Sequence, residues 1–144
     1  MNVITLGTFD LFHVGHVRLL ERCRLLSGPG QVTVGLNSDA FVTRYKGRRP
    51  VIGYDDRAAV LEACRHVDAV VANDQNPSAS AVILASQAEA IVVGNDWEGR
   101  DYSGQLGLPK HWFRDAGIRI IYVPYTEGVS STSIRAAVLA RVDL

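Results

Sequence analysis

The chain has 144 residues, which is enough for one domain and leaves little for a second. Hydrophobic residues make up 47% of it, and 15 Lys and Arg balance 15 Asp and Glu, so the composition excludes a disordered chain and a broadly basic nucleic-acid binder. No apolar run approaches the ~18 residues that span a bilayer, and the first residues lack the pattern of a secretory signal. We therefore expect a single cytoplasmic domain over residues 1–144, with no nucleic-acid or membrane partner and with Cys23 and Cys64 reduced.

Short apolar runs alternate with helical patterns along the chain. In chain order the sequence predicts a strand at 3–6, a helix at 14–26, a strand at 32–36, a polar basic stretch at 44–49, a helix at 54–65, a strand at 68–72, a helix at 79–88, a strand at 90–93, a helix at 110–116, a strand at 118–123 and a helix at 131–140. Breakers support these bounds, because the tetrapeptide SGPG follows the first helix and Gly117 follows the fourth.

Apolar strands separated by helices are typical of a parallel sheet that is buried on both faces. With right-handed crossovers, the five strands give a doubly wound, Rossmann-like α/β fold. Such sheets bind ligands beyond the carboxyl ends of their strands. The polar clusters of this chain lie at those ends, at 7–16, 37–49, 94–101 and 124–132. We therefore expect one binding site at that edge of the sheet.

Two histidines open the first predicted helix. His13 and His16 are three residues apart, so they share a face of its first turn. Gly7 permits a tight turn out of the strand, and Gly15 permits a ligand to approach the backbone. A helix N-terminus favours phosphate, and imidazole N–H donors can stabilise charge on a phosphoryl group. The alternatives are a pair of surface or capping histidines and a zinc pair, but zinc would need a third ligand nearby.

The segment GTFDLFHVGH resembles the HxGH signature of the nucleotidyltransferase superfamily, and within it the cytidylyltransferase group, above all the glycerol-3-phosphate cytidylyltransferases. Four further blocks follow in the family's order: Lys46 with Arg48 and Arg49, then YDDRAAVLEACRHVD, GNDW and TEGVSST. The resemblance spans residues 3–135. It implies an α/β nucleotidyltransferase fold, CTP as donor, a small phosphorylated acceptor such as glycerol 3-phosphate, Mg²⁺ held mainly by triphosphate oxygens, and a homodimer.

The resemblance also implies a role for each matching residue. Catalysis would fall to His13, His16 and Lys46, and Arg48 and Arg57 would bind the acceptor phosphate. The nucleotide would contact these two histidines and Lys46 together with Gly7, Thr8, Phe9, Asp10, Val14, Gly15, Gly94, Asn95, Asp96, Tyr125, Thr126, Gly128, Val129, Ser130, Ser131 and Thr132. Plainer alternatives remain for two of these groups, because a basic stretch is often a solvated loop and hydroxyls at a helix start are often N-caps.

The chain departs from the family pattern at four places. Asn95 stands where the family has an acid, Tyr125 where it has an arginine, and Ala79 where it has a lysine that contacts glycerol phosphate. The stretch 100–111 is longer than in the family. Arg135, or a residue of the basic stretch, is the candidate to replace the cation missing at Tyr125. The changes at Ala79 and 100–111 concern acceptor recognition more than nucleotide binding.

The expected reaction is an in-line attack by an acceptor oxygen on the α-phosphorus of the nucleotide, with pyrophosphate as leaving group. Three alternatives to this reading have different chemistry. One is an adenylyltransferase of the same superfamily, of the kind that makes FAD or an ADP-sugar, and another is a catalytically silent nucleotide-binding module. A truncated class I aminoacyl-tRNA synthetase is excluded, because the chain has no room for a tRNA-binding domain.

Overall fold

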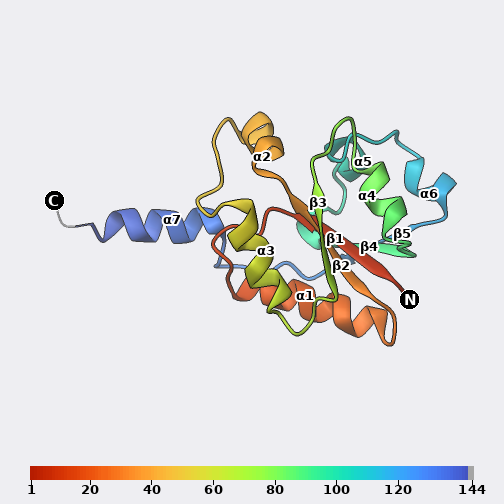
Figure 1. Cartoon of the computed structure of the whole chain (residues 1–144), viewed down its shortest axis with the longest axis horizontal. Helices are drawn as coiled ribbons and strands as arrows, with labels where there is room; N and C mark the ends of the chain where they lie inside the picture. The colour runs from red at the N-terminus through yellow and green to blue at the C-terminus, as the bar shows by residue number, and fades with distance from the viewer. Residues whose placement is uncertain (143–144) are drawn as a thin grey trace.

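A sheet of five parallel strands forms the centre of the computed structural model, which describes residues 1–142 (Figure 1). The strands are β1 (Val3–Gly7), β2 (Val32–Asn37), β3 (Ala69–Asn73), β4 (Ala90–Gly94) and β5 (Arg119–Val123). Their order in the sheet is β3-β2-β1-β4-β5, and every neighbouring pair is parallel. The chain thus winds outward twice from β1, which confirms the predicted doubly wound α/β fold.

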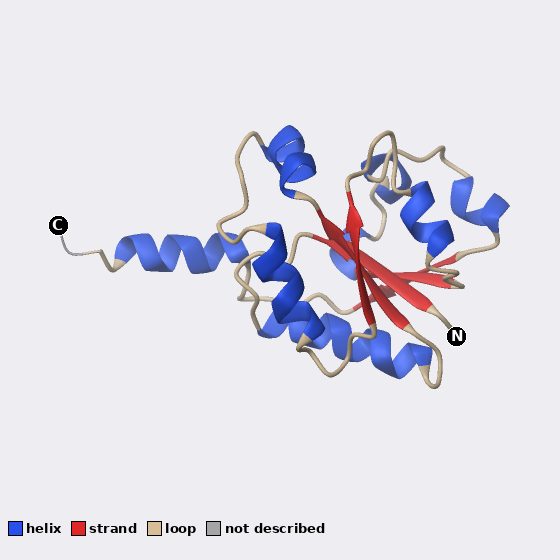
Figure 2. Ribbon diagram, in the orientation of Figure 1, coloured by secondary structure: helices blue, strands red, loops and turns tan. Residues whose placement is uncertain are grey.

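Helices cover both faces of the sheet (Figure 2). One face carries α1 (Val14–Ser27) and α3 (Tyr54–Glu62), and the other carries α4 (Ser80–Ala85), α5 (Tyr102–Gln105) and α6 (Trp112–Ala116). The remaining helices are α2 (Asp39–Lys46), the short 3-10 helix η1 (Asn95–Trp97) and α7 (Ser131–Ala140). In Figure 1, α7 projects away from the body of the domain with its N-terminus nearest the sheet.

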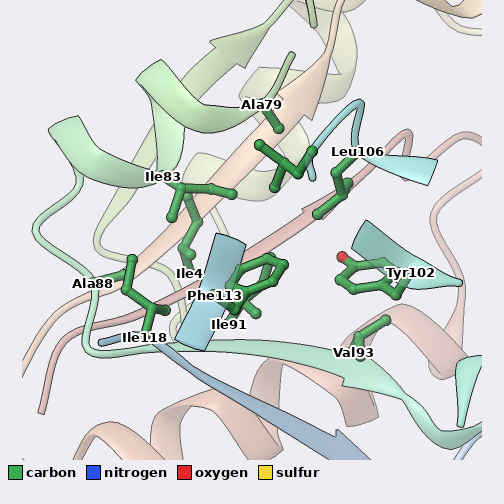
Figure 3. Close-up of a cluster of buried hydrophobic side chains, with 11 residues drawn as sticks. Ile4, Ala79, Ile83, Ala88, Ile91, Val93, Tyr102, Leu106, Phe113 and Ile118 are labelled. Atoms are coloured by element: carbon green, nitrogen blue, oxygen red, sulfur yellow. The ribbon is translucent and has the colours of Figure 1, made fainter. Parts of the chain in front are cut away.

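Alternate residues of the strands pack into different cores, as the two-residue period of a strand requires. Ile4 and Ile91 face α4 and α6, where they contact Ile83 and Phe113 (Figure 3). The neighbouring Val3, Val32 and Val92 instead pack with Cys23 of α1, and Leu20 packs with Leu61 of α3. Because the three central strands are held on both faces, their carboxyl ends form a fixed edge for the loops that follow them.

The structure differs from the predicted elements at several places. The helices α2, α5 and η1 were not predicted, and β3 is less buried than expected. The stretch 44–49 was predicted as a polar basic stretch, but its first residues end helix α2. Ser38 caps this helix by accepting the Phe41 N–H at 3.1 Å, and Gly47 ends it in the left-handed conformation with φ 73°. The sequence predicted a sheet buried on both faces. This prediction is wrong for the edge strand β3, because Val71 and Ala72 are exposed. No helix within residues 1–142 has the length and apolar character needed to cross a membrane.

Candidate active site

A cavity of about 450 Å³ lies beyond the carboxyl ends of the strands, where the sequence predicted a site. Every strand contributes to it through the loop or helix that follows. The lining residues at the end of β1 and after it include Gly7, Thr8, Phe9, Asp10, His13, Gly15 and His16, and those after β2 include Phe41, Tyr45, Lys46, Arg48 and Arg49. Gln75 follows β3, and the residues at the end of β4 and after it include Gly94, Asp96, Trp97 and Gln105. Those after β5 include Tyr125, Thr126, Val129, Ser130, Ser131, Thr132 and Arg135.

The two histidines are fixed by a reciprocal cap at the start of α1. The Gly15 main-chain N–H donates to Nδ1 of His13 at 3.1 Å, and the His13 main-chain N–H donates to Nδ1 of His16 at 3.2 Å. Because each Nδ1 accepts a hydrogen bond, each neutral ring carries its proton on Nε2. The rings stack at 3.8 Å with 25° between their planes. The site therefore offers two Nε2–H donors from adjacent rings.

Burial keeps both imidazoles neutral. It lowers the pKa of His13, and with help from the nearby His13 ring it lowers the pKa of His16 to about 4. The Asp10 carboxylate opposes that shift only in part. Phe9 and Phe12 supply the apolar surroundings, with ring centroids 5.1 and 5.4 Å from His16. Neutral donors of this kind can bind phosphate oxygens without acting as a base at pH 7.

The rings of Phe9 and His13 leave no room for a side chain at Gly7 and Gly15, respectively. A Cβ on Gly7 would lie 2.9 Å from the Phe9 ring, and a Cβ on Gly15 would lie 2.9 Å from the His13 ring. Any side chain at either position would displace an aromatic ring of the site. The sequence predicted that a ligand approaches the backbone at Gly15. In the structure the group closest to this position is the His13 ring.

Asp10 joins three walls of the cavity. Its carboxylate accepts the main-chain N–H groups of Val51 at 2.8 Å and Ile52 at 2.9 Å, which follow the basic stretch. Its main-chain carbonyl accepts the Ser131 hydroxyl at the start of α7. Arg135 of α7 places a guanidinium nitrogen 3.9 Å from the same carboxylate. Asp10 thus lines the cavity, as predicted, but its hydrogen bonds hold protein segments together.

Ser130 and Ser133 form a capping box at the N-terminus of α7. Ser130 accepts the Ser133 N–H at 3.0 Å, and Ser133 accepts the Ser130 N–H at 2.9 Å. With Ser131 bonded to Asp10, the hydroxyl of Thr132 is the one at this helix start with no hydrogen bond among the described residues. The N-cap alternative therefore holds for Ser130, and the helix terminus still presents main-chain N–H groups to the cavity.

Three cations enter the cavity from the segment that begins at the end of α2, namely Lys46, Arg48 and Arg49. Arg44 turns away, since it donates to the main-chain carbonyl of Asp74 at 2.6 Å. These three side chains are exposed, so they are free to follow an anionic ligand. Lys46 and Arg48 are thus brought together in the cavity, as the prediction of phosphate-binding roles requires.

The predicted contact between Arg57 and the acceptor phosphate is wrong. The side chain is 0% exposed and is not among the residues that line the cavity. Its Nε and Nη1 donate to the main-chain carbonyls of Ile52, Thr8 and Asn37 at 2.7 to 2.9 Å, and its Nη2 pairs with Asp39 at 2.7 Å. Arg57 thus connects the carboxyl ends of β1 and β2 with the segment that follows the basic stretch.

Asn95, Val14 and Gly128 were predicted to contact the nucleotide and are not among the cavity-lining residues of the described chain. Asn95 instead accepts the Tyr125 N–H at 3.0 Å, which joins η1 to the loop after β5. Its neighbours Gly94 and Asp96 do line the cavity, as does Tyr125. The segment GNDW therefore lines the cavity with Gly94, Asp96 and Trp97, but not with Asn95.

Sequence reasoning missed several residues of the cavity wall that follow β2, β3 and β4. Phe41 and Tyr45 of α2, Gln75 after β3 and Gln105 of α5 all line the cavity. The spacing of Phe41 and Tyr45 by four residues would have indicated a shared helix face, had α2 been predicted. The glutamines carry no such signal, because their approach depends on how two loops fold over the sheet.

The chain is similar in sequence to known proteins over nearly its whole length. A family model described as cytidylyltransferase-like matches residues 4–137. Glycerol-3-phosphate cytidylyltransferase from Bacillus subtilis (strain 168) is 34% identical over 133 residues, which cover 92% of this chain and 93% of the relative. The bifunctional protein HldE from Koribacter versatilis (strain Ellin345) is 38% identical over 133 residues, but these are only 26% of its length.

A solved structure supports the fold. The lipopolysaccharide core biosynthesis protein from Thermoplasma volcanium GSS1 matches with a TM-score of 0.68 at 20% identity, over 88% of this chain and 96% of that one. At this identity the match speaks for the arrangement of strands and helices alone.

Proposed function

Because the chain belongs to the cytidylyltransferase-like family of nucleotidyltransferases, we propose that it transfers CMP from CTP to a small phosphorylated acceptor, glycerol 3-phosphate or a related phosphorylated polyol, and releases pyrophosphate. One observation carries the proposal. His13 and His16 present paired neutral Nε2–H donors in a cavity that also holds a helix N-terminus and a cluster of cations.

The sheet order supports separate places for the two substrates. Elements after β4 and β5, including Asp96 and the start of α7, lie to one side of β1, and elements after β2 and β3, including Lys46 and Arg48, lie to the other. The histidines follow β1, between these sides. In the proposed assignment the nucleotide occupies the β4 and β5 side, and Lys46 reaches its phosphates from across the cavity. The acceptor occupies the β2 and β3 side beside Arg48, and the α-phosphate reaches the histidines.

The reaction needs little from a general base. An oxygen of the acceptor phosphate, already ionised at pH 7, attacks the α-phosphorus of CTP in line. The new P–O bond forms as the bond to the β-phosphate breaks, and pyrophosphate leaves with the electron pair. His13 and His16 donate to the α-phosphate oxygens as charge builds up on them, and Lys46 and the α7 N-terminus hold the triphosphate.

Mg²⁺ is part of the proposal. The described residues contain no group of three or more His, Cys, Asp or Glu side chains arranged to hold a metal. Mg²⁺ often binds through substrate phosphates and water, and the free carboxylate nearest such phosphates would be Asp96. When bound, the ion would neutralise charge on the leaving pyrophosphate.

The function is tested by pyrophosphate release from each of four nucleoside triphosphates, with Mg²⁺ and a panel of phosphorylated alcohols and sugars. The proposal expects release that depends on the acceptor and is fastest with CTP. Preference for ATP would instead favour an adenylyltransferase. Tight nucleotide binding without release for any acceptor would favour a silent binding module. Light scattering measures whether the expected homodimer forms.

A further inference from the structure

A second cavity, of about 410 Å³, lies on the face of the sheet that carries α5. Most of its lining comes from residues 100–110, and the rest comes from Ile120 and Tyr122 of β5. Tyr102 lines this cavity and the active-site cavity, so its ring forms part of the wall between them. The proposed transfer reaction gives the second cavity no role.

Two cations line the second cavity without an anionic partner. Arg100 and Lys110 form no ion pair and donate no side-chain hydrogen bond within residues 1–142. One carboxylate, Asp101, also lines the cavity, but one of its oxygens already accepts the Gly104 N–H at 3.0 Å. Two cations and one carboxylate leave the lining with a net positive charge, which favours an anionic ligand.

Three hydroxyl groups, those of Tyr102, Ser103 and Tyr122, line the same cavity. Tyr102 and Ser103 are buried, yet none of the three hydroxyls takes part in a hydrogen bond among the described residues. Burial raises the pKa of Tyr102, and the nearby Tyr122 raises it further, so these two hydroxyls lie close to each other. Because buried polar groups are normally hydrogen-bonded, a ligand with several acceptor atoms would supply what these hydroxyls lack.

Arg100 connects the second cavity to the active site. Its guanidinium carbon lies 4.3 Å from the centroid of the Trp97 ring, and Trp97 lines the active-site cavity. The Trp97 ring in turn packs on Tyr102, with ring centroids 5.4 Å apart and 58° between their planes. Stacking occupies the face of a guanidinium and leaves the N–H groups at its edge able to donate. The wall between the cavities therefore fixes Arg100 without using its donors.

We propose that the second cavity binds the phosphate group of a small molecule, with Arg100 and Lys110 as its cations and the three hydroxyls as further donors. Guanidinium and ammonium groups form strong, charge-assisted hydrogen bonds to phosphate oxygens. A carboxylate offers two oxygens, whereas phosphate offers more of them to the five donor side chains that surround the cavity. This inference goes beyond the proposed function and does not depend on it, because no step of the transfer uses this cavity.

Calorimetric titration at low ionic strength tests the proposal with three probes: inorganic phosphate, methyl phosphate and acetate. The proposal expects phosphate or its methyl ester to bind at least about tenfold more tightly than acetate, since each lost charge-assisted hydrogen bond costs that factor or more. Tighter binding of methyl phosphate would indicate a phosphorylated metabolite, and tighter binding of inorganic phosphate would indicate the free ion. Equal binding of acetate, or no binding of either phosphate, overturns the proposal.

Variants then separate the two cavities, since the active site is also expected to bind phosphate. Lys110→Gln and Arg100→Gln should each weaken one component of phosphate binding by about tenfold or more, and Tyr122→Phe should weaken it about 2- to 10-fold. Arg48→Ala, in the active-site cavity, should leave this component intact. Arg114→Gln, at an exposed arginine outside both cavities, is the matched control.

The outcomes of the variants are distinct. Phosphate binding that disappears in Arg48→Ala and persists in Lys110→Gln would place the ion in the active site and overturn the proposal. Equal weakening in Arg114→Gln would indicate unspecific attraction to surface charge and would overturn it as well. Thermal midpoints verify that each variant is folded. The titrations need no turnover, so a failure to detect nucleotidyl transfer would refute the proposed function and leave this test unaffected.

Discussion

The main-chain N–H of His13 donates to Nδ1 of His16, so the first histidine of the pair orients the second. The rings are in contact at 3.8 Å, and each has its remaining N–H on Nε2. His13 caps α1 with its own ring and orients the ring of His16, so the fold of α1 fixes where the two Nε2–H groups lie in the cavity.

Replacing His16 by alanine should lower kcat at least ~10²-fold. Loss of one donor to charge that develops on a transferring group costs about 3–4 kcal/mol in the transition state. Pyrophosphate release measures the rate, and the thermal midpoint reports the smaller cost of the lost cap. His111→Ala, at an exposed histidine whose side chain caps nothing, serves as control. Near-normal turnover in folded His16→Ala would contradict the role of the histidine pair.

Stability should fall as the pH drops from 6.5 toward 4. The pKa of His16 is about 4 in the folded protein and its ordinary value is 6.5, so in this window the unfolded chain binds a proton that the folded chain does not. The free energy of unfolding should therefore decline by up to about 1.4 kcal/mol per pH unit from this residue. Urea unfolding at several pH values should give a flatter profile for His16→Gln, which keeps an acceptor for the His13 N–H. Parallel profiles for the variant and the unaltered protein would contradict the lowered pKa.

Lys46→Ala and Arg48→Ala should separate kinetically. A lost charge-assisted hydrogen bond to phosphate costs about 1.5–3 kcal/mol, or roughly 10- to 150-fold in affinity. We expect Lys46→Ala to weaken nucleotide binding and Arg48→Ala to raise KM for the acceptor by that factor. Calorimetry with the nucleotide and steady-state kinetics with the acceptor distinguish the two, and Arg44→Ala, outside the cavity, is the control. The opposite pattern would exchange the roles.

Arg57→Lys should destabilise the protein by about 3–5 kcal/mol. The lysine ammonium cannot reproduce the bonds of the buried guanidinium to three carbonyls and to Asp39. Denaturant unfolding measures the loss, and Arg65→Lys, at an exposed arginine beyond α3, should cost little. A stable Arg57→Lys protein with a raised KM for the acceptor would restore the binding role that the structure removes.

Periodicity and breakers were enough to predict the strands and the five longer helices outside α2, because buried runs and glycine stops are local signals. The histidine pair was predicted as well, since it is contiguous in sequence. Arg57 was not, because an arginine in a helix carries no mark of the carbonyls that will surround it. Gln75 and Gln105 were missed for a related reason. Their proximity arises where two segments cross, and no pattern within either segment encodes that crossing.

Asp10 bears on how such a site could be altered. Its carboxylate holds the segment after the basic residues, and its carbonyl holds the start of α7, so the two sides of the cavity share one anchor. The wall that carries Gln105 lies outside this anchor and is fastened to the loop after β3 and to the core beneath α4. A protein engineer who exchanged residues 98–108 for a segment from a relative could therefore reshape this wall of the cavity while the histidines, the cations and α7 kept their places.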